Sequence, residues 1–268
     1  MNDLITVGIE AAQEAGRFLK ENFGKTELMI ERKADHSLAT NIDKESEQLI
    51  VDRIKQRFPE HGIIGEERGQ DGAERDFMWI IDPLDGTHNY IRGIPVFGVS
   101  IGVVHHDQFV AGVIYLPMDD SLYIGERGNG AFCNGKPIRV STQGDLAETT
   151  ISFDSSLRSR QEMKLPLLGA LAARTFNLRM FGASVRVLTF LAEGRMDATV
   201  EIEDRCWDYA AGACLIEAAG GKVTDLMGKP LHYKAKGYIA TNGLVHSDLL
   251  KITQSHLSRL SEPTPVRK

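Results

Sequence analysis

Cysteine is scarce in this chain of 268 residues, which contains only Cys133, Cys206 and Cys214. None of the three belongs to a Cys-x-x-Cys pair, so the pattern fits neither a disulfide framework nor a thiolate zinc site. We therefore expect reduced thiols and a cytoplasmic protein. Cys206 flanks Trp207, but no general base stands near it in the sequence, so we interpret it as a packed thiol.

The sequence also lacks long apolar runs and an excess of positive charge. No stretch approaches the roughly 20 apolar residues that span a bilayer, and the start Met1-Asn2-Asp3 does not look like a signal peptide. Lys and Arg number 31 against 37 Asp and Glu, a net charge of −6. Without a general basic field we expect no nucleic-acid or membrane partner.

Apolar periodicity predicts a mixture of helices and strands. Helices are expected near residues 4–24, 42–58, 160–174, 183–193, 208–219 and 247–260. Strands are expected near 77–81, 96–104, 109–116, 121–126, 150–154, 196–201, 222–225 and 237–241. Asn134-Gly135 predicts a tight hairpin before Ile138-Arg139-Val140, and the tail Pro263–Lys268 is expected to be loose.

The strand-rich middle and the alternating second half predict a mixed α/β fold of two lobes that share one core. We place the boundary near residue 145, with an N-terminal lobe over 1–145 that carries a metal and phosphate loop. A C-terminal α/β lobe over 146–268 would complete the active site in one compact unit.

The segment Asp82-Pro83-Leu84-Asp85-Gly86-Thr87-His88-Asn89 is the most informative part of the chain. Two carboxylates follow a predicted buried strand, and Gly86 would let a ligand approach the backbone. A helical turn that starts near Thr87 would point free N–H groups at an anion. Carboxylates for a hard cation and amides for a phosphate are what metal-assisted phosphate chemistry requires. A bare Asp-x-x-Asp-Gly is more often a capped turn, so other acids must support this interpretation.

Two further acidic positions provide that support. Glu66 and Glu67 follow the apolar pair Ile63-Ile64, and Asp208 opens an apolar helix after Trp207. The alternatives are a solvated loop for the two glutamates and a helix N-cap for Asp208, which can be both cap and ligand.

Together these motifs make the chain resemble the inositol monophosphatase-like family of magnesium-dependent, lithium-sensitive phosphatases. Residues 82–89 match its Asp-Pro-[Leu/Ile]-Asp-Gly-Thr-x-Asn signature, and residues 207–212 match Trp-Asp-x-Ala-Ala-Gly in full. The Gly-Glu-Glu element matches at 65–67. The resemblance implies a layered αβαβα sandwich of the sugar-phosphatase type and a homodimer.

The same resemblance implies two or three Mg²⁺ ions. Glu66, Asp82 and the carbonyl of Leu84 would hold the first ion, and Asp82, Asp85 and Asp208 the second. Every candidate ligand atom is oxygen, which favours Mg²⁺ over Zn²⁺.

The resemblance also assigns groups around the attacking water and the phosphate. Asp43 would accept a hydrogen bond from the Thr87 hydroxyl, and Thr87 and Glu66 would orient the water. The Gly86 and Thr87 amides would hold the phosphate. Lys33 matches a mobile-loop lysine of many relatives, although a surface lysine is an equal alternative.

On the leaving-group side, the resemblance implies a substrate-binding set that consists of Asp85, Gly86, Thr87, Gly182, Ala183, Ser184, Glu201 and Asp208. Within it, Glu201 would accept hydrogen bonds from substrate hydroxyls. Arg186 departs from the apolar or small residue of many relatives. It would either face a subunit interface or serve a second phosphate, and it puts inositol phosphate as natural substrate in doubt.

The function predicted is hydrolysis of a small polyol or sugar phosphate, with inositol 1-phosphate as the default substrate, by in-line attack of metal-activated water without a phosphoenzyme. The segment Ile91–Phe97 also resembles relatives that take fructose 1,6-bisphosphate. Histidinol phosphate and 3′-phosphoadenosine 5′-phosphate are further options. A regulatory binding protein that retains the fold is the alternative from another class, disfavoured because every motif acid is present.

Overall fold

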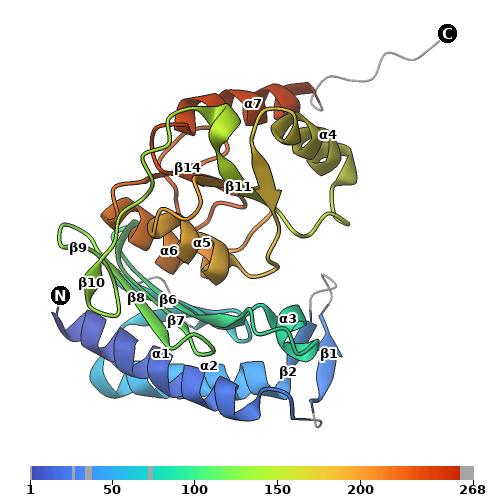
Figure 1. Cartoon of the computed structure of the whole chain (residues 1–268). Helices are drawn as coiled ribbons and strands as arrows, with labels where there is room; N and C mark the ends of the chain where they lie inside the picture. Colours follow the sequence, from blue (N-terminus) through green and yellow to red (C-terminus); the bar gives the residue numbers. More distant parts are fainter. Residues whose placement is uncertain (1, 26–27, 34–37, 72–74, 260–268) are drawn as a thin grey trace.

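Helical layers and β-sheets alternate in the computed structural model of the chain, which describes residues 2–25, 28–33, 38–71 and 75–259 (Figure 1). The predicted loose tail Pro263–Lys268 lies outside these residues. The layers run from helices α1 and α2 through a large sheet, helices α5 and α6 and a smaller sheet to helices α4 and α7. The layered αβαβα fold predicted from the sequence is therefore correct.

The large sheet has eight strands in the order β10-β9-β8-β7-β6-β5-β3-β4. Strands β5 to β10 form an antiparallel meander, whereas β3 runs parallel to β5. The bounds are β3 Gly62–Gly65, β4 Gly69–Asp71, β5 Phe77–Asp85, β6 Gly98–His105, β7 Gln108–Leu116, β8 Ser121–Glu126, β9 Gly130–Cys133 and β10 Lys136–Pro137.

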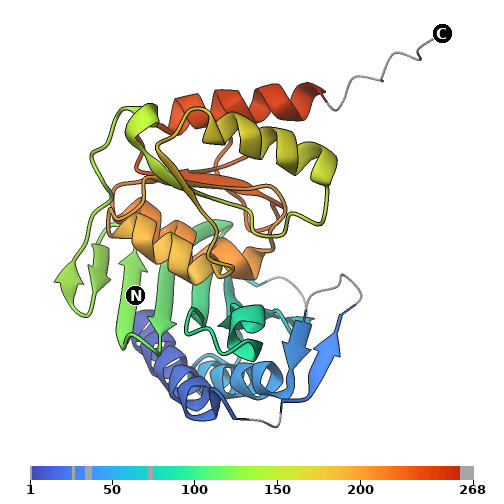
Figure 2. The same cartoon turned by 45° about the vertical axis from the view of Figure 1, so that its right-hand side comes forward.

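The smaller sheet has five strands in the order β12-β11-β13-β15-β14, with both parallel and antiparallel pairs. Its strands are β11 Thr150–Phe153, β12 Asn177–Arg179, β13 Ala198–Glu201, β14 Lys222–Asp225 and β15 Tyr238–Thr241. A separate hairpin of β1 Ile30–Arg32 and β2 Leu38–Thr40 stands beside the short helix α3 (Figure 2).

The helices form close to the predicted positions because their apolar faces pack on the sheets. They are α1 Asn2–Asn22, α2 Asn41–Arg57, α3 Thr87–Ile91, α4 Gln161–Ala172, α5 Ser184–Ala192, α6 Cys206–Ala218 and α7 His246–Arg259, with a 3₁₀ turn at Leu146–Glu148. Three apolar clusters fill the spaces between successive layers, and the middle one joins the large sheet to α5 and α6.

A row of glycines brings α6 unusually close to the large sheet. Gly102, Gly112 and Gly125 pair with one another across β6, β7 and β8. A Cβ atom at Gly112 would lie 2.2 Å from the carbonyl oxygen of Ala211 on α6. Only glycine permits this approach, which sets the depth of α6 and hence the position of Asp208 in its first turn.

The strands differ from the prediction in several places: β1, β2, β4 and β12 were not expected, and the boundaries of others shift. Strand β5 does not end at Ile81 but continues to Asp85, because Asp82 still pairs with Ser100 and the irregular register that follows accommodates Pro83. The hairpin at Asn134-Gly135 is present, with positive φ at both residues as a type I′ turn requires. Strand β10 ends at Pro137, however, so Ile138–Val140 are not part of it.

His246 is buried where α7 begins and joins the last two strands of the smaller sheet. Its Nδ1 lies 3.0 Å from the Thr241 hydroxyl, and its Nε2 lies 3.0 Å from the Thr224 hydroxyl. The Thr224 hydroxyl already donates to the carbonyl of Asp225, so it can accept from Nε2–H. The Thr241 hydroxyl accepts from the Gly243 amide and can donate to Nδ1, an arrangement that suits the neutral ring. Burial, followed by the charge of Lys222, lowers the pKa of His246 to about 4.

We expect this histidine to make the fold acid-sensitive. Its pKa is depressed in the folded state, so its contribution is complete above pH 6.5 and is lost as pH falls toward about 4. Relative to His246→Gln, the wild-type protein should lose about 1–2 kcal/mol of unfolding free energy between pH 7 and pH 5. Urea titrations of both metal-free proteins at the two pH values measure this difference, and equal losses would contradict it.

Candidate active site

Three carboxylates converge where the large sheet meets α6. Asp82 and Asp85 come from the end of β5 and Asp208 from the first turn of α6, and one oxygen of each lies within 4.8 Å of the others. Glu66 follows β3, the parallel neighbour of β5. All four acids line one cavity of ≈ 400 Å³, together with Leu84, Gly86, Thr87 and Gly182. The predicted metal and phosphate residues thus share a single cavity.

The protein compensates the carboxylates in this cavity only in part, because Lys33 pairs with Glu66 and the other three receive backbone hydrogen bonds. The pKa of Glu66, Asp85 and Asp208 is raised to about 7 in each case, chiefly by burial and with a contribution from neighbouring carboxylates. The pKa of Asp82 is raised still more, first by burial and then by Glu66 and Asp85. Such a group of buried oxygens is stable in its charged form only with a cation, and an all-oxygen donor set suits a hard divalent ion.

The loop after β5 has a conformation that only glycine allows. Gly86 has φ +91°, and a Cβ atom there would lie 2.8 Å from the carbonyl oxygen of Val96. Helix α3 starts directly after it at Thr87, as predicted. Asp85 accepts a hydrogen bond from the Val185 amide at the start of α5, so this carboxylate also joins the loop to the next layer.

Asp208 is both a capping-box residue and a member of the acidic cluster. Its side chain accepts a hydrogen bond of 2.8 Å from the Arg205 amide in a capping-box arrangement. Asp208 is not the N-cap expected from the sequence, because the N-cap is Arg205 and Asp208 stands at the third helical position of the capping box. Its role as a metal ligand stays a prediction.

The Thr87 hydroxyl lies 3.0 Å from an Asp43 carboxylate oxygen, the contact expected from the resemblance. It lies at the same distance from the carbonyl of Leu84. The other oxygen of Asp43 accepts from the amide and hydroxyl of Thr40 and caps α2. Asp43 is fully buried, and burial raises its pKa although these hydrogen bonds oppose the rise.

Two polar residues on the same face of α2 were not identified from the sequence. Ser46 donates to the carbonyl of Pro83 at 2.9 Å. Glu47 accepts from the amides of Glu67 and Arg68 at 2.9 and 3.0 Å. These contacts hold the backbone on either side of the site. The sequence pattern that could have identified Ser46 and Glu47 is their spacing of three and four residues from Asp43, which places all three on one helix face.

Lys33 lies against the site rather than free on the surface. Its ammonium group is 2.8 Å from Glu66 and 2.6 Å from Glu67. Burial opposes the charge on Lys33, but the two glutamates outweigh it and raise its pKa. Glu67 is therefore a partner of Lys33, and its side chain is only 6% exposed.

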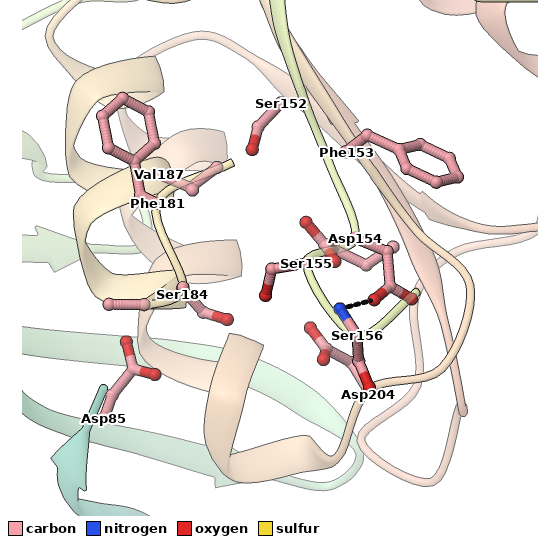
Figure 3. A pocket seen from close by; sticks show the side chains of 13 residues that line it. Asp85, Ser152, Phe153, Asp154, Ser155, Ser156, Phe181, Ser184, Val187 and Asp204 are labelled. Carbon is pink, nitrogen blue, oxygen red and sulfur yellow. Dashed lines mark hydrogen bonds between the residues drawn. The ribbon is translucent and has the colours of Figure 1, made fainter. Parts of the chain in front are cut away.

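A second cavity of ≈ 120 Å³ adjoins the first, and Asp85 and Gly182 line both. Ala183, Ser184 and Glu201 line the second cavity, as the resemblance implies. Asp154 and Asp204 also line it and were missed, because nothing in their sequence neighbourhood distinguishes them from surface acids. Figure 3 shows Asp154 and Asp204 together on one side of this cavity and Asp85 and Ser184 on the other.

Arg186 and Cys206 take no part in either cavity lining. Arg186 pairs with Asp119 at 2.5 Å and lies over the ring of Phe190. This pairing gives no support to a second phosphate site at Arg186. Burial raises the pKa of Cys206 to about 12, which agrees with a packed thiol and not with a nucleophile.

Sequence comparison relates this arrangement to known proteins. The family model described as the inositol monophosphatase family matches residues 1–258. The chain belongs to the inositol monophosphatase family. A fructose-1,6-bisphosphatase/inositol-1-monophosphatase from Aquifex aeolicus is 37% identical over 250 residues, which cover 92% of this chain and 94% of the relative. The Nus factor SuhB of Escherichia coli K12 is 34% identical over 262 residues, covering 96% of this chain and 98% of that protein.

The solved structures of this family agree with the fold. An IMPase from Thermotoga maritima superposes with a TM-score of 0.88 at 31% identity, covering 97% of this chain and all of the other. Within the described residues, no helix has the length and apolar character that crossing a membrane requires.

Proposed function

We propose that this member of the inositol monophosphatase family is a Mg²⁺-dependent phosphomonoesterase that hydrolyses a small polyol or sugar phosphate. The observation that carries the proposal is the convergence of Asp82, Asp85 and Asp208 within 4.8 Å, in one cavity with Glu66 and the Gly86-Thr87 turn. Carboxylate oxygens for hard cations thus stand beside backbone amides for a phosphate.

The acids and the Leu84 carbonyl would hold the metal ions. Asp82 would contribute to both sites, Glu66 and Leu84 would complete one, and Asp85 and Asp208 would complete the other. Bound Mg²⁺ would lower the pKa of water and neutralise charge on the phosphate and the leaving alcohol. The hydrogen bond from the Leu84 amide to Asp82, 3.0 Å long, fixes the orientation of that carboxylate.

The proton of the attacking water requires an acceptor that is already oriented. We propose that the Thr87 hydroxyl accepts a hydrogen bond from the water and donates its own hydrogen to Asp43, 3.0 Å away. Glu66 would orient the same water from the other side. The amides of Gly86 and Thr87, at the start of α3, would hold the phosphate oxygens.

The second cavity would receive the alcohol part of the substrate. Gly182, Ala183, Ser184 and Glu201 line it, and Glu201 would accept hydrogen bonds from hydroxyl groups. Inositol 1-phosphate is the default substrate. We further propose a lithium-sensitive cytoplasmic homodimer, in which the lobes over 1–145 and 146–268 act as one unit.

Release of phosphate from a substrate panel tests this function. The panel should contain inositol 1-phosphate, fructose 1,6-bisphosphate, histidinol phosphate, 3′-phosphoadenosine 5′-phosphate and p-nitrophenyl phosphate, each with and without Mg²⁺. We expect release that requires Mg²⁺. The name of the SuhB relative motivates the alternative of a regulatory binding protein. Folded, Mg²⁺-loaded protein that releases no phosphate from any of these compounds would favour that alternative.

Glu201→Ala should act mainly on substrate choice. Glu201 is buried, its carboxylate accepts from the Thr199 hydroxyl at 2.8 Å, and it is not among the proposed metal ligands. We expect KM for a polyol phosphate to rise about tenfold, with a smaller change for p-nitrophenyl phosphate, whose alcohol lacks hydroxyl donors. Steady-state kinetics on both substrates measure this difference. Equal losses on the two would remove Glu201 from substrate recognition.

A further inference from the structure

The cavity that adjoins the metal site is lined by acids without a basic counterpart. Asp85, Asp154, Glu201 and Asp204 contribute four carboxylates, and the thirteen residues around this cavity include no Lys, Arg or His. Asp85 also faces the proposed metal site, so cations there would compensate it. The question is what compensates the other three.

Asp154 has a partner within the protein. Lys164 of α4, which is completely buried, places its ammonium group 2.8 Å from this carboxylate. The same ammonium group donates hydrogen bonds to the carbonyl oxygen of Ser156 and to the hydroxyl oxygen of Ser159. The other oxygen of Asp154 accepts from the Ser156 amide at 2.8 Å, the bond drawn in Figure 3. The Asp154 charge is thus balanced from behind the cavity wall.

Glu201 and Asp204 lack such a partner among the described residues. Glu201 is 7% exposed, and its carboxylate accepts a hydrogen bond from the uncharged Thr199 hydroxyl. One Asp204 oxygen is buried and has no hydrogen-bond partner, and the same holds for the buried Tyr238 hydroxyl. Burial and then Asp154 raise the pKa of Glu201 to about 8, and burial, Asp208 and Glu201 raise that of Asp204. Among the described residues, the two carboxylates therefore face the cavity without an ion pair of their own, and the charge of Lys164, which is paired with Asp154, only opposes the rise in the pKa of Glu201.

A buried carboxylate that the protein leaves unpaired is costly unless the ligand supplies the missing charge. We propose that Glu201 and Asp204 select a phosphate monoester whose alcohol part carries an ammonium group. This inference rests on the proposed phosphatase function and specifies its substrate class. A second phosphate dianion in this cavity would meet four carboxylates and no basic side chain, so the same wall disfavours bisphosphates that place it there.

Matched pairs of synthetic esters test the inference. We would measure kcat/KM for 2-aminoethyl, 3-aminopropyl and 4-aminobutyl phosphate, each against the hydroxyalkyl phosphate of the same length. For the best chain length the amine ester should exceed its hydroxyl partner at least about tenfold, since a charge-assisted hydrogen bond replaces a neutral one. Amine and hydroxyl esters of equal kcat/KM at every length would overturn the proposal. Absence of turnover on all esters, including p-nitrophenyl phosphate, would instead refute the phosphatase function itself.

Conservative variants identify the groups responsible. Asp204→Asn and Glu201→Gln should each reduce the amine-to-hydroxyl preference about fivefold or more. Glu162→Gln is the control, because it removes the same charge from an exposed side chain on α4 that does not line the cavity; it should keep the wild-type preference. Equal loss on amine and hydroxyl esters in Asp204→Asn would show a structural role and overturn the assignment of Asp204.

Discussion

Asp82→Asn should reduce kcat/KM for any substrate at least about 100-fold, while the protein stays folded. Replacing groups that only support a metal ligand commonly costs 10–100-fold, and Asp82 is proposed to contact two ions directly. The asparagine can still accept the hydrogen bond from the Leu84 amide. Its neutral side chain also relieves repulsion by Glu66 and Asp85, which together with burial raises the pKa of Asp82.

Thermal melting with and without Mg²⁺ separates loss of metal binding from loss of fold. Mg²⁺ should raise the melting temperature of the wild-type protein, because a ligand that binds only the native state stabilises it. It should have little effect on Asp82→Asn, whose metal-free form should melt no lower than the wild type. Asp52→Asn, which changes an exposed acid on α2, is the control and should respond to Mg²⁺ normally. A folded Asp82→Asn protein with near-normal turnover at moderate Mg²⁺ would refute the metal assignment.

Thr87→Ala is expected to lower kcat about 100-fold without changing the Mg²⁺ dependence. Loss of a positioned acid–base group has an effect of this order, and the Thr87 side chain is not a proposed ligand. Asp43→Asn should show a similar loss. Their 3.0 Å contact makes them one unit, so the double variant should be clearly less impaired than the product of the two single losses.

Asp43 has a second role that the experiment must separate from the first. It caps α2 through Thr40, so Asp43→Asn also disturbs a helix end. Thr40→Ala removes the hydroxyl part of this cap and leaves the Thr87 contact in place. It should cost about 1 kcal/mol of stability and spare kcat. Additive kcat losses in the double variant, or a lower melting temperature with unchanged kcat in Asp43→Asn, would remove the pair from the mechanism.

The sequence alone determined the features that depend on neighbouring residues. Apolar periodicity located the main helices and strands, because each element buries a face of its own sequence. Asn134-Gly135 specified its turn through backbone conformation. The segments 82–89 and 207–212 carried enough local chemistry to predict an oxygen-rich site for cations, and the structure brings Asp82, Asp85 and Asp208 together.

Only the tertiary structure decided which distant side chains complete that site. Glu47 acts on backbone amides 20 and 21 residues away, a contact that no local pattern predicts. Strand β5 extends past Asp82 because β6 provides a pairing partner, which overrides the local effect of Pro83. Lys164 forms its ion pair with Asp154, and one Asp204 oxygen has no hydrogen-bond partner. Charge compensation depends on separations of a few ångströms between α4, β11, β13 and the loop before α6, and these are set only when the layers pack.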